Sequence, residues 1–194
     1  MLTLDKVAVT GGLASGKSTV CLLFKEAGAT VVDSDEIVHR LLSSNPQCIK
    51  AAVELLGKDI YTDGTIDRKK IAEQVFKDQK KLHQLEQILH PAVFEEIERI
   101  YAQTRPGLFV AEVPLLFETG YDKSFHTTIA VVCDEAIAIT RYGNATEFHQ
   151  RMARQLSGEE KAKRADHVIL NHGPVEELKV QVKELLTKLK KNRL

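Results

Sequence analysis

The stretch GGLASGKST, at residues 11–19, decides the fold of this chain. It matches the pattern G-x-x-x-x-G-K-S/T. A short apolar run at residues 6–10 precedes it, and Val20, Leu23 and Phe24 follow it at helical spacing. A strand, a glycine-rich turn and a helix in this order form a phosphate-binding loop, in which backbone N–H groups face an anion. The sequence therefore predicts an α/β fold built around such a loop.

The residue types in the loop suit a nucleoside triphosphate with its metal ion. The ammonium group of Lys17 would lie beside the β- and γ-phosphates of ATP, and the hydroxyl of Ser18 would bind Mg²⁺. A glycine-rich surface turn with a solvated lysine is the alternative, and the strand and helix on either side favour phosphate binding. The expected ATP-binding residues of the loop are Gly12, Ala14, Ser15, Gly16, Lys17, Ser18 and Thr19.

Five short apolar runs predict the strands of one sheet. Most of them are separated by helical patterns, and such alternation requires crossovers that pack helices on both faces of a parallel sheet. We therefore expect a three-layer P-loop kinase fold with a five-stranded parallel sheet, a helical insertion and a lid. The runs are residues 6–10, 30–32, 108–113, 127–133 and 165–170.

The distance between the second and third runs is far longer than an ordinary connection of ~2 to 6 residues, and its pattern is helical. We expect a helical acceptor subdomain at residues 36–105 and a lid at residues 141–156. The nucleotide-binding core would then comprise the remaining segments, residues 1–35, 106–140 and 157–194.

Two helix boundaries can be read inside the insertion. Asp67 can cap a helix that carries Ile71 and Val75 on one face. Proline is tolerated at the first position of a helix, so Pro91 should begin a new helix after a bend at Leu89 and His90.

Composition limits the possible partners. The 194 residues contain 27 Lys and Arg against 27 Asp and Glu, so the formal net charge is zero. We expect no nucleic-acid partner and no membrane partner, because no long-range field attracts either and the apolar runs are too short to span a bilayer. Three scattered cysteines favour a reducing compartment, the cytoplasm. The expected state is a monomer or a small homo-oligomer acting on small molecules.

Carboxylates at the ends of two apolar runs are candidates for chemistry. Asp33 and Asp35 follow the second run, at the edge where open α/β sheets bind ligands. One of them could accept the proton of an attacking hydroxyl, and alternation along an extended segment would point both the same way. Asp35 could equally be a helix N-cap. Glu112 ends the third run, where a carboxylate can bind Mg²⁺ through water, although a strand-end glutamate is the alternative.

Positive charge gathers between the fourth and fifth runs, and Gly143 lies among it as a possible hinge of a lid. A guanidinium that reaches the transferring phosphoryl group on closure would stabilise its developing charge. Arg141 is the leading candidate for this catalytic role. The alternative is that these side chains are simply solvated, as most arginines on a polar helix face are. The cations are Arg141, Arg151, Arg154, Lys161, Lys163 and Arg164.

Taken together, these residues resemble the dephospho-CoA kinase family, whose members phosphorylate the ribose 3′-hydroxyl of dephospho-coenzyme A in the last step of coenzyme A synthesis. The resemblance extends over nearly the whole chain. Its motifs are VTGGLASGKST at 9–19, VVDSD at 31–35, IDRKKIAEQVF at 66–76, LEQILHP at 85–91, VPLLFE at 113–118, RMARQ at 151–155 and ADHVILNHG at 165–173.

The resemblance implies a role for individual residues. Asp35 would be the base toward the 3′-hydroxyl, and Asp33 would support Asp35 or the metal. Lys17 would contact the phosphates, and Arg141 would act from the lid, with Arg151 as the alternative. The cleft for dephospho-CoA would be lined by His90, Leu115, Leu116 and Phe117. The adenine of ATP would lie near Asn171 and Gly173.

Three positions depart from the usual pattern of the family. Ala14 replaces a common glycine, Glu112 a common aspartate and Leu170 a common aspartate. Two other hypotheses remain open at this point. One is another P-loop nucleoside or nucleotide kinase, and the other is a nucleotide-dependent switch that binds ATP or GTP without phosphorylating an acceptor.

Overall fold

The computed structural model describes residues 5–62 and 64–191. The chain forms two compact units, of which the first comprises Met1–Asp33 and Gln103–Leu194 and the second Ser34–Ala102. The expected ranges of the nucleotide-binding core include residues 1–4 and 192–194, which lie outside the described residues.

The first unit contains the expected parallel sheet. Its strand order is β2-β5-β1-β6-β7, and every neighbouring pair is parallel. This confirms the α/β fold with a five-stranded parallel sheet. The strands are β1 (Asp5–Gly11), β2 (Thr30–Asp33), β5 (Leu108–Glu112), β6 (Thr127–Val132) and β7 (His167–Leu170).

Strand register brings chemistry to one edge of this sheet. In a parallel sheet all carboxyl ends lie on the same side. Glu112 at the end of β5 is the register partner of Val9 on β1 and of Asp33 on β2. The phosphate-binding loop leaves β1 at Gly11, so the loop, Asp33 and Glu112 lie at this same edge.

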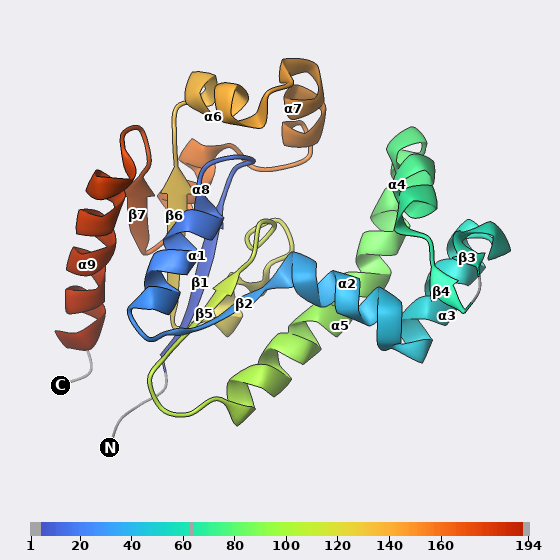
Figure 1. Cartoon of the computed structure of the whole chain (residues 1–194), viewed down its shortest axis with the longest axis horizontal. Coiled ribbons are helices and arrows are strands. Elements are labelled where there is room, and N and C mark those ends of the chain that lie inside the picture. The colour runs from blue at the N-terminus through green and yellow to red at the C-terminus, as the bar shows by residue number, and fades with distance from the viewer. Residues whose placement is uncertain (1–4, 63, 192–194) are drawn as a thin grey trace. The chain divides into compact units, whose positions relative to one another are not determined.

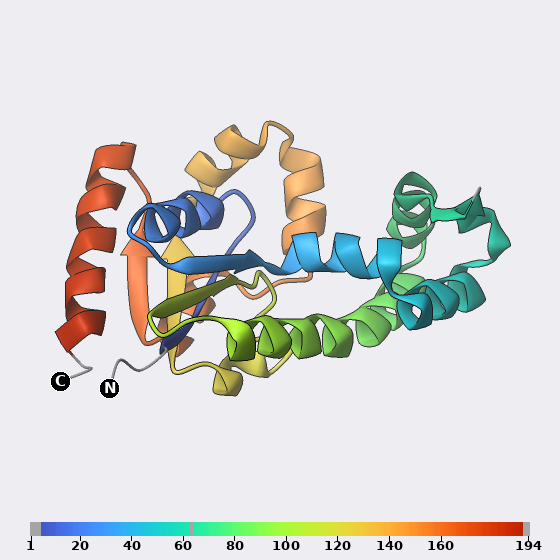
Figure 2. The same ribbon diagram turned by 60° about the horizontal axis from the view of Figure 1, so that its bottom comes forward.

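Helices cover both faces of the sheet in the first unit (Figure 1). Val7 and Val9 on β1 face α1 and α9, whose apolar stripes complete a buried core with Phe24 and Leu178. On the opposite face, α8 packs against β1 and β6 (Figure 2). The helices of this unit are α1 (Lys17–Glu26), α6 (Glu135–Tyr142), α7 (Ala145–Met152), α8 (Gly158–Arg164) and α9 (Val175–Lys191), with the 3-10 helix η2 (Tyr121–Ser124).

The second unit is mainly helical, with a small hairpin that the sequence did not predict. Asn45 caps α3, and Asp67 accepts from the N–H groups of Lys69 and Lys70 at the start of α4, which confirms the predicted cap. The elements are α2 (Ser34–Ser44), α3 (Pro46–Leu56), η1 (Lys58–Ile60), β3 (Tyr61–Thr62), β4 (Thr65–Ile66), α4 (Arg68–Lys77) and α5 (Gln79–Gln103).

The predicted helix break at Pro91 is wrong. Pro91 lies inside α5, which runs without interruption from Gln79 to Gln103. Proline in a helix interior removes one hydrogen bond and costs about 3 kcal/mol. Buried apolar side chains continue along one face on both sides of it, among them Leu89 and Val93. Their burial, at ~1.5 to 3 kcal/mol for each large side chain, exceeds the local cost.

No helix among the described residues is both long and apolar enough to cross a membrane.

Candidate functional site

Two glycines give the phosphate-binding loop its shape. Gly16 has a φ of 98° and precedes α1, and a Cβ added there would collide with the side chain of Asn171. A Cβ on Gly11 would collide with the carbonyl oxygen of Val131 on the neighbouring strand β6. Only glycine fits both positions, since it has no side chain and tolerates positive φ. The loop therefore lies directly against β6 and Asn171.

Ala14 is the residue in the loop other than glycine that has a positive φ. Its φ of 55° is in the left-handed region, where an L-residue other than glycine is strained. The chain keeps the left-handed conformation at this position in spite of the Cβ. The backbone geometry of the loop therefore does not depend on glycine here.

Lys17 is the first residue of α1 and folds back over the loop. Its Nζ donates a hydrogen bond of 2.8 Å to the carbonyl oxygen of Gly12. The ammonium group thus lies close to the backbone of the loop. The positive end of α1 adds to the same field.

Ser18 and Glu112 come together across 94 residues of sequence, because the first turn of α1 passes over the end of β5. The Ser18 hydroxyl donates to Oε1 of Glu112 at 3.0 Å. Burial raises the pKa of the Glu112 carboxyl, and the nearby Asp33 carboxylate acts in the same direction, while Ser18 and Lys17 lower it. Four of the expected site residues thus interact at the carboxyl edge of the sheet.

The oxygens of Ser18 and Glu112 fit Mg²⁺. This ion prefers oxygen ligands and is usually held by one or two protein oxygens together with waters and substrate phosphates. The hydroxyl and the carboxylate are adjacent and lie beside the loop. In residues 5–62 and 64–191 there is no group of three or more His, Cys, Asp or Glu side chains with the geometry of a metal site.

The Glu112→Gln variant should gain stability relative to the wild type as the pH rises. The raised pKa of the Glu112 carboxyl means that the folded state binds a proton more readily than the unfolded state. Between the pKa of the unfolded state and that of the folded state, the stability of the wild type therefore falls with increasing pH, by at most about 1.4 kcal/mol per pH unit. Glutamine does not titrate and still accepts from Ser18.

Urea unfolding of both proteins from pH 4 to pH 8 measures this effect. The free energy of unfolding of Glu112→Gln minus that of the wild type should increase along the series. A constant or decreasing difference contradicts the assignment of Glu112 as a destabilised, buried carboxylate.

A chain of polar contacts connects Arg141 to the phosphate-binding loop. Asn171, which follows β7, donates from Nδ2 to the carbonyl oxygen of Ser15 at 2.8 Å and is 8% exposed. Its Oδ1 accepts from Nη2 of Arg141 at 3.4 Å. Arg141 is in the last turn of α6, and Gly143, with a φ of 84°, ends that helix. The structure thus brings Arg141 close to the phosphate-binding loop through Asn171.

The other candidate arginine is held on its own helix. Arg151 forms an ion pair of 2.8 Å with Glu147, one turn earlier on α7, and its guanidinium lies 5.9 Å from the ring centre of Tyr142. Lys161 also differs from the other cations of this region. It is fully buried, whereas the sequence suggested a charged, accessible group.

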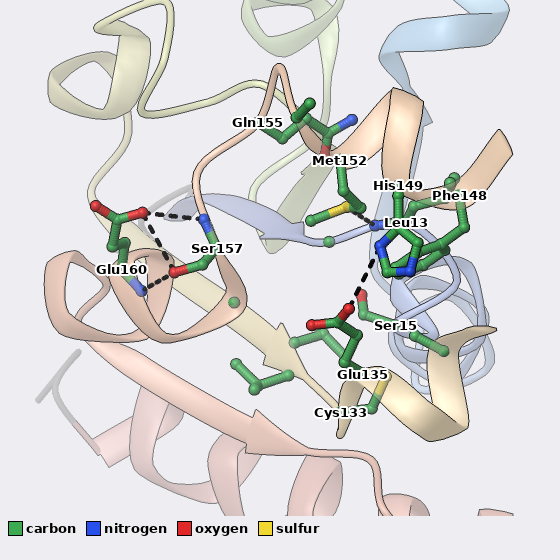
Figure 3. Close-up of a pocket in the computed structure, with 16 residues that line it drawn as sticks. Leu13, Ser15, Cys133, Glu135, Phe148, His149, Met152, Gln155, Ser157 and Glu160 are labelled. Carbon is green, nitrogen blue, oxygen red and sulfur yellow. Dashed lines mark hydrogen bonds and ion pairs between the residues drawn. The ribbon is translucent and has the colours of Figure 1, made fainter. Parts of the chain in front are cut away.

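A cavity of about 470 Å³ opens between the loop, the end of β6 and the helices α6, α7 and α8 (Figure 3). Sequence reasoning missed it and the residue that closes one side of it. Met152, the last residue of α7, accepts the N–H of Leu13 through Sδ at 3.4 Å. Among the residues that line the cavity, Nδ1 of His149 and Oε1 of Glu135 are 3.5 Å apart. Only the tertiary contact distinguishes Met152 from an ordinary residue of an amphipathic helix.

The expectation that Asp33 and Asp35 share an extended segment is wrong. β2 ends at Asp33 and α2 begins at Ser34, so Asp35 is an exposed residue in the first helical turn. It is therefore not the N-cap either. In a helix, consecutive side chains project at about 100° to one another. Side chains two residues apart in a helix therefore do not point to the same side.

The expected acceptor residues differ in how accessible they are. After β5, Leu116 has no exposed surface and Phe117 is 9% exposed, whereas Leu115 is partly exposed. His90 lies on α5 in the second unit, and burial lowers its pKa against the opposing effect of Glu86.

The remaining expected nucleotide residue, Gly173, lies between β7 and α9. A Cβ at this position would meet the carboxylate of Glu177 in the first turn of α9. Gly173 is thus a place where the backbone comes close to a helix N-terminus.

Known proteins match the chain over almost its entire length. The family model for dephospho-CoA kinase matches residues 6–177. A dephospho-CoA kinase of Protochlamydia amoebophila is 48% identical over 200 residues, covering 98% of each chain.

Solved structures have the same fold. A Thermus thermophilus protein is 30% identical with a TM-score of 0.81, covering 96% of this chain and 98% of its own. Dephospho-CoA kinase from Campylobacter jejuni, at 23% identity, has a TM-score of 0.72 over 99% of this chain and 100% of its own. From the family match and the full-length similarity we conclude that this chain belongs to the dephospho-CoA kinase family.

Proposed function

We propose that the protein transfers the γ-phosphoryl group of ATP to the ribose 3′-hydroxyl of dephospho-CoA, giving coenzyme A and ADP in the last step of coenzyme A synthesis. The observation that carries this proposal is the group formed by Lys17, Ser18 and Glu112 at the carboxyl edge of the sheet. Membership of the dephospho-CoA kinase family identifies the acceptor.

The loop binds and orients the triphosphate. Its backbone N–H groups and the N-terminus of α1 attract the phosphate oxygens. Lys17 exchanges the carbonyl oxygen of Gly12 for oxygens of the β- and γ-phosphates. The Ser18 hydroxyl, and Glu112 through water, would hold Mg²⁺, which would supply positive charge to the phosphates.

The lid stabilises charge on the transferring group. The contact of Arg141 with Asn171, which itself binds the loop, supports this role. Arg151 would first have to leave its ion pair with Glu147. These contacts favour Arg141 over Arg151 as the catalytic arginine. Asn171 and Gly173 are our candidates for residues beside the adenine.

On the acceptor side, Asp35 accepts the proton of the 3′-hydroxyl in our proposal, and Asp33 supports it or the metal. An exposed carboxylate is accessible to a substrate hydroxyl, as this role requires. His90 and residues 115–117 line the dephospho-CoA site. Of these three residues Leu115 is the most exposed, while Leu116 and Phe117 are buried.

In the same proposal, residues 36–105 form the acceptor subdomain and residues 141–156 the lid of the nucleotide-binding core. We place the protein in the cytoplasm, where its three cysteines, which are free thiols, would remain reduced. We expect a monomer or a small homo-oligomer.

Release of ADP from ATP and Mg²⁺ tests the reaction, with dephospho-CoA, adenosine, AMP and uridine offered separately and a control without acceptor. Strong stimulation by dephospho-CoA alone is the expected result. Stimulation by a nucleoside or nucleotide instead would keep the kinase chemistry and overturn the acceptor. Release that does not depend on any acceptor, or no release, would favour a nucleotide-dependent switch.

A further inference from the structure

Lys161 is a buried charge that the reaction proposed above does not use. It lies in the middle of α8 and has no exposed surface, whereas Glu160 and Lys163 on the same helix are exposed. A lysine is almost never fully buried unless its ammonium group is paired. The partners of Lys161 therefore indicate what the residue is for.

Both partners of Lys161 lie in the segment that follows β5, residues 114–118. Its Nζ donates to the carbonyl oxygen of Pro114 at the beginning of this segment. The same atom is 3.1 Å from Oε1 of Glu118 at its end. The ammonium group thus holds both ends of the segment that contains the expected acceptor residues 115–117.

Each of these acceptors also binds a donor from another part of the first unit. The carbonyl oxygen of Pro114 accepts from the hydroxyl of Thr10 at 3.1 Å, one residue before the phosphate-binding loop begins. Oε1 of Glu118 accepts from the N–H of Leu156 at 2.8 Å, at the end of the expected lid. One buried ammonium therefore connects the strand of the loop, residues 114–118 and the end of the lid.

Stability alone does not explain a lysine at this position. Removing an ammonium group from water costs several kcal/mol, and replacing a buried ion pair with well-packed apolar residues is often neutral or stabilising. A methionine has a similar length and would fill the space. The ammonium group, unlike a methionine side chain, forms directional hydrogen bonds. Its N–H donors fix where Pro114 and Glu118 lie relative to α8.

We propose that Lys161 is a positioning residue for the acceptor, which holds residues 114–118 in place against the strand of the phosphate-binding loop and the end of the lid. The inference rests on the proposed function, because it assigns these residues to the binding of dephospho-CoA. Lys161 does not touch the reacting atoms and acts through the main chain of this segment.

The test is Lys161→Met in the full-length protein, with KM measured separately for dephospho-CoA and for ATP. We expect KM for dephospho-CoA to rise roughly tenfold, because a misplaced segment weakens binding of the acceptor. KM for ATP should change by less than about twofold. An equal change in both constants, or no change in either, overturns the inference.

A second variant separates positioning from stability. Lys161→Met alone leaves the carboxylate of Glu118 without its cation, which can prevent folding. In the double variant Lys161→Met with Glu118→Gln, no charge is left unpaired, and the glutamine oxygen still accepts from Leu156. We expect a Tm close to that of the wild type together with the same rise in KM for dephospho-CoA. If both Tm and KM for dephospho-CoA return to the wild-type values, Lys161 has a merely structural role, and the inference is overturned.

Hydrogen exchange gives a readout that does not depend on activity. The N–H groups of Thr119 and Tyr121 donate to carbonyl oxygens of Leu115 and Leu116. They should exchange faster in the double variant than in the wild type, while the N–H of Val113, bonded to β1, should not. Unchanged exchange at Thr119 and Tyr121 contradicts the inference.

Lys163→Met, an exposed change on the same helix, is the matched control and should leave both KM values within about twofold. If the wild type shows no ADP release that depends on dephospho-CoA, the proposed function fails, and the role of Lys161 fails with it. If the wild type is active and the double variant binds dephospho-CoA normally, only the role of Lys161 fails.

Discussion

Substituting methionine for Lys17 is expected to lower kcat for phosphoryl transfer roughly a thousandfold. Removing one preorganised donor from developing negative charge typically costs on the order of 10²- to 10³-fold, and a full positive charge at the γ-phosphate belongs at the upper end. Methionine keeps the length of the side chain, so the loop loses charge without losing volume. The hydrogen bond to Gly12 is lost as well, at about 1 kcal/mol.

Single-turnover measurement of ADP formation, with ATP and acceptor saturating, gives this rate directly. Lys25→Met is the matched control, because Lys25 is an exposed lysine in the last turn of the same helix. It should retain normal turnover. A Lys17→Met protein with turnover within tenfold of the wild type would contradict the phosphate role of Lys17.

Asp35→Asn is expected to lower turnover about 10²- to 10⁴-fold, the usual contribution of a positioned general base. Asparagine keeps the shape and cannot accept the proton of the 3′-hydroxyl. Because the change lies outside the phosphate-binding loop, KM for ATP should stay within about threefold of the wild-type value. Stability should fall by no more than about 1 kcal/mol, since a carboxylate in a first helical turn interacts only modestly with the helix dipole.

The control for this variant is Glu36→Gln, which removes the adjacent exposed carboxylate from the same turn of α2. Its effect on the helix dipole is matched, and its turnover should remain normal. Equal losses in the two variants would mean that the charge of the turn matters and that Asp35 is not the base. Normal turnover in Asp35→Asn would remove the assignment altogether.

Much of the fold follows from patterns that are local in sequence. The five strands are short apolar runs, and their parallel arrangement follows from the helical patterns between them. The cap at Asp67 depends on the backbone within three residues of it, and so it was correctly predicted. The turn after β1 likewise follows from nearby glycines.

Local reasoning failed where a distant contact outweighs a local preference. Pro91 has the local character of a helix start, yet buried side chains on both sides keep α5 continuous. Asp35 lies two residues after a strand, so its conformation depends on where α2 begins. Because α2 begins at Ser34, Asp35 is helical and not extended. Lys161 has the same sequence context as its exposed neighbour Lys163, and only the carbonyl oxygen of Pro114 and the carboxylate of Glu118 distinguish it.

The sequence by itself determined the fold class, the family and the phosphate-binding loop, because these depend on residue types at short, fixed spacings. Only the tertiary structure decided which polar groups meet. It placed Ser18 against Glu112, Asn171 between Ser15 and Arg141, and the ammonium of Lys161 inside the protein. The physical reason is that the electrostatic environment, the burial and the hydrogen bonds of a side chain depend on atoms distant in sequence. The path of the backbone, in contrast, depends largely on residues that are neighbours in sequence.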